Sequence, residues 1–253
     1  MKLKNRVSII TGATRGIGWI ISKYFVLNGS SVIIVGRNLA KGKEAEELLL
    51  QEGGKAKFIQ TDISKEDEVE NMIENTISIF GGIDILVNNA AVTGRGDKFY
   101  DMSLNEWENY IDTNLTGTFL CSKYAAKEMI KNNSGKIVNI SSVYGSLVSP
   151  GTSAYSSSKA GINQLTKAMA IDLSEYKVNV NCVAPGAIET AEKKEHRDPK
   201  LEKALLENII LKRRGKAEEV AKLVVFLASD DSDYINGETI TIDGGLTTHF
   251  QNY

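Results

Sequence analysis

The chain has 253 residues, of which 42% are hydrophobic and 25% are charged, as in an ordinary globular protein. Its 30 basic and 32 acidic residues give a formal net charge of −2, which argues against a nucleic-acid-binding protein, because such proteins carry a basic excess. No apolar run approaches the length of a membrane span and no signal-peptide pattern is present, so we expect a cytoplasmic protein without a membrane segment.

Short β-rich runs alternate with amphipathic helical stretches along the whole chain. The β-rich runs are mostly continuous apolar segments, which is typical of strands covered by helices on both faces. The predicted strands are Val7–Ile10, Ser31–Val35, Ala56–Gln60, Ile83–Val87, Lys136–Ile140, Val178–Val183 and Thr239–Ile242. The predicted helices are Gly16–Asn28, Leu39–Gln51, Glu66–Phe80, Leu104–Lys131, Ala154–Ser174 and Ala217–Ala228. This alternation predicts a single α/β domain over residues 1–253, a doubly wound Rossmann fold whose seven-stranded parallel sheet has helices on both faces.

A glycine-rich loop, Thr11-Gly12-Ala13-Thr14-Arg15-Gly16-Ile17-Gly18, joins the first predicted strand to the first helix. Gly12 allows a tight turn, Gly16 lets the backbone approach a pyrophosphate, and Gly18 permits close packing of helix on strand. The amino end of the helix faces the bound anion. The sequence has no G-x-x-x-x-G-K-[ST] run, so the loop predicts a dinucleotide site rather than a P-loop NTPase.

The end of the second predicted strand, Val35-Gly36-Arg37-Asn38, bears on the choice of nucleotide. NAD-specific domains carry an acidic residue here that bonds the ribose 2′-hydroxyl, and this sequence has none. Arg37, together with Arg15 on the facing loop, supplies two guanidinium groups that suit a 2′-phosphate. The sequence therefore favours NADP(H) over NAD(H).

Tyr155 and Lys159 are four residues apart in a predicted helix and face the same side of it. The pKa of a free tyrosine is about 10, and a cation about 4 Å away would stabilise the phenolate by about 4 kcal/mol at an effective dielectric of about 20. The pair can therefore protonate a ketone that accepts hydride, or deprotonate an alcohol. Ser142, at the end of the fifth predicted strand, can hydrogen-bond the substrate oxygen.

Several ordered motifs together resemble the short-chain dehydrogenase/reductase family. They are the Thr11–Gly18 loop, Asn88-Asn89-Ala90-Ala91, Asn114, Ser142, Tyr155 with Lys159, and Pro185-Gly186 through Thr190. The resemblance covers about Lys4 to Gly245, and the family pattern has the same spacing between its serine and its tyrosine. It implies an enzyme that interconverts a ketone and a secondary alcohol with a nicotinamide cofactor.

The resemblance also implies roles for individual residues. Asn114 would extend a proton relay through water to Lys159, which would also bond the nicotinamide ribose. Asp62 would bond the adenine, Asn88 would contact the adenine-side ribose or its backbone, and the loop ending at Thr190 would hold the carboxamide. The residues expected to act in catalysis are Asn114, Ser142, Tyr155 and Lys159. Those expected to contact the cofactor are Gly12, Thr14, Arg15, Gly16, Ile17, Gly18, Arg37, Asp62, Ile63, Asn88, Tyr155, Lys159, Pro185, Gly186, Ile188 and Thr190.

The resemblance leaves the substrate open. The first choice is a 3-oxoacyl thioester of the acyl-carrier-protein type, and the alternative is a sugar, as in glucose 1-dehydrogenases, or another polyol or steroid. Carrier-protein reductases often have basic residues before the fifth and sixth strands, where this sequence has Asn133 and Tyr176. The non-enzymatic alternative is a nucleotide-binding sensor that retains the fold. Loss of either residue of the tyrosine–lysine pair would favour the sensor, and both are present.

Two segments late in the chain have separate interpretations. Residues 190–214 are highly charged but carry helical apolar spacing, and we predict a short lid over the site, at the sheet edge where such folds bind ligands. The aromatic tail, residues 246–253, is predicted to dock on a neighbouring subunit, and the resemblance implies a homodimer or homotetramer. The only two histidines, His196 and His249, form no cluster, so no metal is expected.

Overall fold

The computed structural model describes residues 1–190 and 198–248. Its main sheet has seven strands in the order β3-β2-β1-β4-β5-β6-β9, and every neighbouring pair is parallel. The strands are β1 (Val7–Thr11), β2 (Ser31–Gly36), β3 (Lys55–Gln60), β4 (Ile85–Asn88), β5 (Gly135–Ile140), β6 (Val178–Pro185) and β9 (Thr239–Ile242). The strand order reverses beside β1, and that switch point is where open α/β sheets bind ligands. The predicted doubly wound parallel sheet is confirmed.

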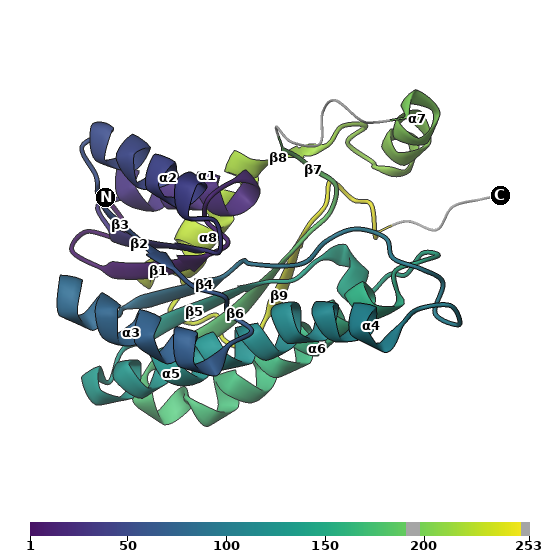
Figure 1. Ribbon diagram of the computed structural model, residues 1–253. Helices are drawn as coiled ribbons and strands as arrows, with labels where there is room; N and C mark the ends of the chain where they lie inside the picture. Colours follow the sequence, from purple (N-terminus) through teal and green to yellow (C-terminus); the bar gives the residue numbers. More distant parts are fainter. Residues whose placement is uncertain (191–197, 249–253) are drawn as a thin grey trace.

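Helices cover both faces of this sheet (Figure 1). One layer contains α1 (Gly16–Leu27), α2 (Leu39–Gln51) and α8 (Ala217–Leu227). The other contains α3 (Glu66–Phe80), α5 (Gly117–Asn132) and α6 (Ser153–Asp172). Successive strand residues point to opposite faces, so Ile10 belongs to the core under the first layer while Ile9 belongs to the core under the second. Burial on both faces explains the continuous apolar runs.

The prediction of one continuous α-helix over Leu104–Lys131 is wrong in one respect. The chain forms α4 (Leu104–Ile111), then a π-helical turn over Asp112–Thr116, then α5. The turn contains Asn114, whose buried amide bonds the backbone of Val92 in a neighbouring loop. A π-turn inserts an extra residue into the helical ladder and is frequent at functional sites. Spacing of apolar residues alone could not reveal it, because helical periodicity continues on both sides.

The segment predicted as a lid, residues 190–214, contains α7 (Pro199–Asn208). A small parallel pair that the sequence did not predict, β7 (Ile188–Glu189) with β8 (Gly215–Lys216), flanks it on its two sides. The side chain of Asp198 caps α7 by accepting a bond from the Lys200 amide. Figure 1 shows α7 beyond the carboxyl ends of the strands, apart from both helix layers.

Part of the predicted lid, residues 191–197 with His196, lies outside the described residues. So does most of the predicted docking tail, residues 249–253 with His249. Within the two described ranges, no helix combines the length and the apolar character needed to cross a membrane.

Candidate active site

A cleft of about 910 Å³ opens at the carboxyl edge of the sheet, around the switch point. Most of the residues predicted for the site line it, although they come from segments far apart in the sequence. They are Gly12, Thr14, Arg15, Gly16, Ile17, Gly18, Arg37, Asp62, Ile63, Ser142, Tyr155, Lys159, Pro185, Gly186, Ile188 and Thr190. A large cleft that gathers polar groups at this edge is the usual ligand site of such folds.

The glycine-rich loop is packed too tightly for larger residues. Gly12 has φ +64°, and a Cβ added there would lie 2.7 Å from the Ala90 backbone. A Cβ on Gly18 would lie 2.5 Å from the Gly12 carbonyl oxygen. The Asn89 amide donates to the carbonyls of Thr11 and Gly12 at 2.9 and 3.1 Å, which fixes the loop against β4. The loop is therefore a rigid cradle with room only for glycine at these positions.

The amino end of α1 is open to an anion. Within the described residues, no side chain caps it, and its first turn contains no carboxylate. The first backbone N–H groups of a helix lack partners inside the helix and carry a partial positive charge. This end, with Arg15 beside it in the cleft lining, fits the pyrophosphate of a dinucleotide.

Cationic side chains surround the cleft where β2 ends. Arg37 is 65% exposed, and its guanidinium lies 4.0 Å from an Asp62 carboxylate oxygen. The other Asp62 oxygen accepts bonds from the backbone and the hydroxyl of Ser64 at 3.1 and 2.8 Å. Among the described residues, the Arg37 guanidinium has this one long and exposed ion pair, so it can turn toward a phosphate. The lining here fits the adenosine end of a phosphorylated dinucleotide.

Tyr155 lies at the inner part of the cleft, near the start of α6. Its ring packs edge-on between Tyr110 and Tyr144, with centroid separations of 6.3 and 6.0 Å. Burial raises the pKa of Tyr155, and a hydrogen bond with the Ser142 side chain partly opposes that rise. The phenol is therefore protonated near neutral pH and can donate its proton.

Lys159 is buried one turn further along α6, with 2% of its surface exposed. Its ammonium donates to the Ile140 carbonyl at 2.8 Å and lies 5.8 Å from the centre of the Tyr155 ring. Burial lowers the pKa of Lys159 to about 8. The expectation that this cation lowers the pKa of Tyr155 is not met in this structure. Burial of the phenol dominates, and Lys159 is engaged by a main-chain carbonyl.

Two predicted site residues, Asn88 and Asn114, are not among the described residues that line this cleft. Asn88 is 3% exposed and donates to Ser122 and Asn139, both at 2.9 Å, so its side chain stabilises the core rather than reaching a ribose. The Asn114 amide is engaged by Val92 and Ser158 at 2.7 to 3.1 Å. It braces α6 from the π-turn, and no bond to Lys159 occurs among the described residues.

Several residues that line the cleft were not predicted from the sequence. Tyr144 and Arg95 come from the loops after β5 and β4, while Leu205 and Leu246 come from the lid and from the segment after β9. For Asn89, which hydrogen-bonds the glycine-rich loop, the adjacent asparagines at the end of β4 were a signal in the sequence. The other four residues belong to no sequence motif, because their segments meet only in the folded protein.

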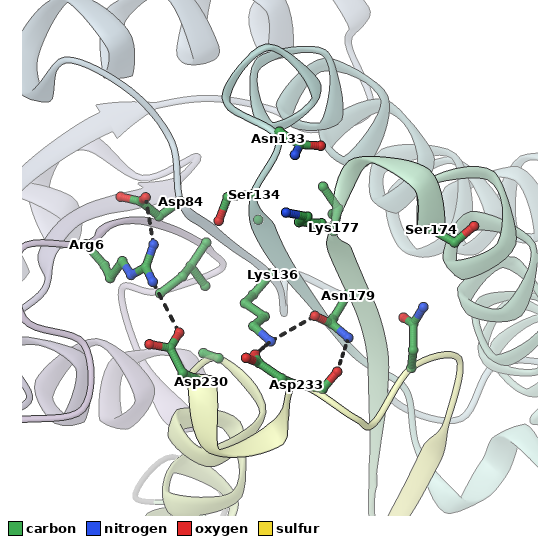
Figure 2. Close-up of a pocket in the computed structure, with 15 residues that line it drawn as sticks. Arg6, Asp84, Asn133, Ser134, Lys136, Ser174, Lys177, Asn179, Asp230 and Asp233 are labelled. Carbon is green, nitrogen blue, oxygen red and sulfur yellow. Dashed lines mark hydrogen bonds and ion pairs between the residues drawn. The ribbon is translucent and has the colours of Figure 1, made fainter.

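A second cavity, of about 430 Å³, lies at the opposite, amino edge of the sheet (Figure 2). Its charged groups are largely paired with one another. Arg6 donates to Asp84 and Asp230 at 3.4 and 3.2 Å, and Lys136 bonds Asp233 at 2.6 Å. These pairs join the starts of several strands, so the charged groups of this cavity stabilise the framework of the sheet. No group of metal-binding side chains occurs among the residues that the structure describes.

Comparison with known proteins agrees with this geometry. The family described as Enoyl-(Acyl carrier protein) reductase matches residues 12–247. A 3-oxoacyl-[acyl-carrier-protein] reductase of Aquifex aeolicus is 42% identical over 97% of this chain and 99% of its own. A glucose 1-dehydrogenase of Bacillus subtilis is 35% identical over 98% and 96%. A double mutant of a Serratia marcescens short-chain dehydrogenase/reductase superposes with a TM-score of 0.92 at 30% identity, covering 98% of this chain and all of that one.

Proposed function

Because the chain belongs to the short-chain dehydrogenase/reductase family, and is thus an oxidoreductase, we propose that it interconverts a ketone and a secondary alcohol with NADP(H). Tyr155 is the acid and base of this reaction. The observation that carries the proposal is the half-buried Tyr155, whose ring centre lies 5.8 Å from the Lys159 ammonium, in the same cleft as Ser142 and a helix end open to an anion.

When bound, the nicotinamide supplies or takes up the hydride. Ser142 and Tyr155 hold the substrate oxygen between two hydroxyl groups, which fixes the carbonyl and stabilises the charge that grows on it. Tyr155 then donates its proton to that oxygen. Since burial keeps the phenol protonated, the arrangement favours ketone reduction near neutral pH. Alcohol oxidation needs the phenolate, and therefore a higher pH.

Lys159, one turn after Tyr155 on α6, supports this proton transfer. With a pKa of about 8, its ammonium can release or hold a proton close to neutral pH. The family resemblance assigns it a further bond to the nicotinamide ribose, and we keep that assignment together with the cofactor contacts expected at Pro185, Gly186, Ile188 and Thr190. Asn114 acts on this group through its hold on α6 rather than by contact.

The preference for NADP(H) rests on Arg15 and Arg37 in the cleft lining and on the missing acid after β2. We expect NADPH to bind at least about tenfold more tightly than NADH, because a charge-assisted hydrogen bond contributes about 1.5–3 kcal/mol. Titrating the purified protein with each nucleotide, followed by fluorescence, measures this directly. Tighter binding of NADH would overturn the preference and leave the reaction class standing.

For the substrate, we propose a 3-oxoacyl thioester, supported by the Aquifex relative. The alternative is a sugar, supported by the Bacillus relative and by the neutral Asn133 and Tyr176, where carrier-protein reductases often have basic residues. NADPH oxidation with an acetoacetyl thioester, against NADP⁺ reduction with glucose, separates the two. Turnover of glucose alone would overturn the thioester assignment.

The remaining proposals concern the whole protein. We propose one cytoplasmic domain with α7 as its lid, since Leu205 and Arg214 line the cleft and Arg214 forms a two-point ion pair with Glu202. We also propose a homodimer or homotetramer, supported by the exposed Phe119 on α5 and Ile171 on α6, with the tail beyond 246 docked on a neighbour. Light scattering of the full chain measures the oligomeric state, and the same measurement on a chain ending at residue 245 tests whether the tail contributes to it.

A further inference from the structure

The lining of the cleft carries more positive than negative charge. Outside the glycine-rich loop and the turn from β2 into α2, three cations line the cleft, Arg95, Lys159 and Arg214, whereas Asp62 is the one carboxylate among the described lining residues. Asp62 lies beside Arg37, at the adenosine end. No other carboxylate lines the cleft in the described residues, although Glu202, outside the lining, pairs with Arg214. Low-dielectric cleft walls strengthen the attraction of the remaining positive charge for anions.

Arg95 is the one of these three cations that is free to bind a ligand. The Lys159 ammonium donates to the Ile140 carbonyl at 2.8 Å. Arg214 is held by Glu202 through two bonds of 2.7 and 2.6 Å. For Arg95, by contrast, none of the carboxylates that the structure describes lies within ion-pair distance.

The backbone around Arg95 is tied to the catalytic helix. The Gly96 amide donates to the Gly151 carbonyl at 2.8 Å, four residues before Tyr155. The approach is so close that a Cβ on Gly151 would lie 2.5 Å from the Gly96 carbonyl oxygen. The backbone at Arg95 is therefore held against the turn that leads into α6 and Tyr155, and its exposed side chain extends from a fixed point of the cleft lining.

We propose that Arg95 is a specificity residue that binds an anionic group of the substrate, a carboxylate or a phosphate, while Tyr155 and Ser142 hold the carbonyl. The inference rests on the proposed function and names the substrate class of the same site. A guanidinium is planar and binds a carboxylate or phosphate through two parallel hydrogen bonds, so it fixes the orientation of the substrate as well as its affinity.

The same loop offers a matched control. Lys98, three residues further on, is also a surface cation, but its ammonium faces the Tyr100 ring at 5.8 Å and does not line the cleft. Arg95→Gln and Lys98→Gln each remove one positive charge from this loop. If general surface charge attracts anions, both variants lose the same amount. If Arg95 binds the substrate, only its own variant does.

The test compares two pairs of ketones. Within each pair the reacting ketone is the same, and one member carries a negatively charged group while the other is neutral. Acetoacetate is compared with methyl acetoacetate, and acetoacetyl-CoA with the neutral acetoacetyl N-acetylcysteamine thioester, all at saturating NADPH. For the wild type we expect kcat/KM at least tenfold higher with one anionic ketone than with its neutral partner. Arg95→Gln should remove that preference through KM, and Lys98→Gln should keep it. Preference within the first pair identifies a carboxylate, and preference within the second a phosphate.

Binding without turnover separates this inference from the proposed reaction. Calorimetry of 3-hydroxybutyrate, its methyl ester, CoA and the neutral N-acetylcysteamine measures binding to the anion site alone when each is added to the protein with NADPH, because an alcohol cannot transfer hydride to the reduced nucleotide. Loss of turnover on every ketone would count against the reaction, while anion binding that depends on Arg95 would still support the inference. Equal affinity for charged and neutral compounds, absence of anion binding, or an unchanged preference in Arg95→Gln would overturn it.

Discussion

Replacing Lys159 by Met should make the protein more stable at neutral pH, although it removes a catalytic residue. The folded protein holds the pKa of Lys159 at about 8, against an ordinary value of 10.5, because burial penalises the ammonium. At about 1.36 kcal/mol per pKa unit, this is a cost of about 3 kcal/mol. The unfolded chain binds the proton more tightly, so the cost is fully present below pH 8 and disappears as the pH rises to 10.5.

Lys159→Met removes this cost. It also removes the hydrogen bond from the lysine to the Ile140 carbonyl, which lowers the stability by about 1 kcal/mol. The variant should therefore be about 2 kcal/mol more stable than the wild type at pH 7, an advantage that shrinks as the pH rises above 8. Urea unfolding at fixed protein concentration, at pH 7 and 9.5, measures both free energies of unfolding. Lys167→Met, which changes an exposed lysine on the same helix, should show no pH-dependent difference. A constant difference between Lys159→Met and wild type at both pH values would refute the reasoning.

Three further substitutions test other parts of the site. Gly18→Ala should abolish nucleotide binding or destabilise the fold, because its methyl would lie 2.5 Å from a loop carbonyl, whereas Gly82→Ala, with nothing within 4 Å, should change neither in thermal-shift titrations with NADPH. Arg37→Asp should weaken NADPH binding at least about tenfold and spare NADH, and equal losses for both nucleotides would contradict the 2′-phosphate assignment. Arg214→Gln removes the two bonds that Arg214 makes to Glu202, so limited proteolysis should cut α7 faster than in wild type, and unchanged cleavage would argue against a role of this ion pair in holding α7.

The sequence predicted the sheet well because its physical causes are local. A strand covered on both faces must be apolar throughout, and several such runs separated by amphipathic helices leave few arrangements. The glycine-rich loop and the i,i+4 spacing of Tyr155 and Lys159 are local in the same way. Residues that line the cleft through such patterns could therefore be identified from the amino-acid sequence alone.

The features that were missed depend on contacts across the fold. Asn88 carries a suitable amide at the right strand end, but its neighbours Ser122 and Asn139 turn it into the core. The π-turn contains Asn114, whose side chain accepts a hydrogen bond from the Val92 amide, 22 residues away in the sequence. The local interpretation of Lys159 as a cation close to phenolate omitted the burial of both groups, which reverses the direction of the Tyr155 pKa shift. Arg95 has no motif and gains its place only through the tie between Gly96 and Gly151.

The central claim, that Tyr155 transfers the proton while the nucleotide is held elsewhere, is tested most directly by Tyr155→Phe. This change removes one hydroxyl and keeps the ring between its two tyrosine neighbours. We predict that the variant binds NADPH within about threefold of wild type by fluorescence titration. We also predict a loss of ketone turnover of about a hundredfold or more, the usual contribution of a positioned acid. Turnover within a few-fold of wild type, at unchanged nucleotide affinity, would contradict the account.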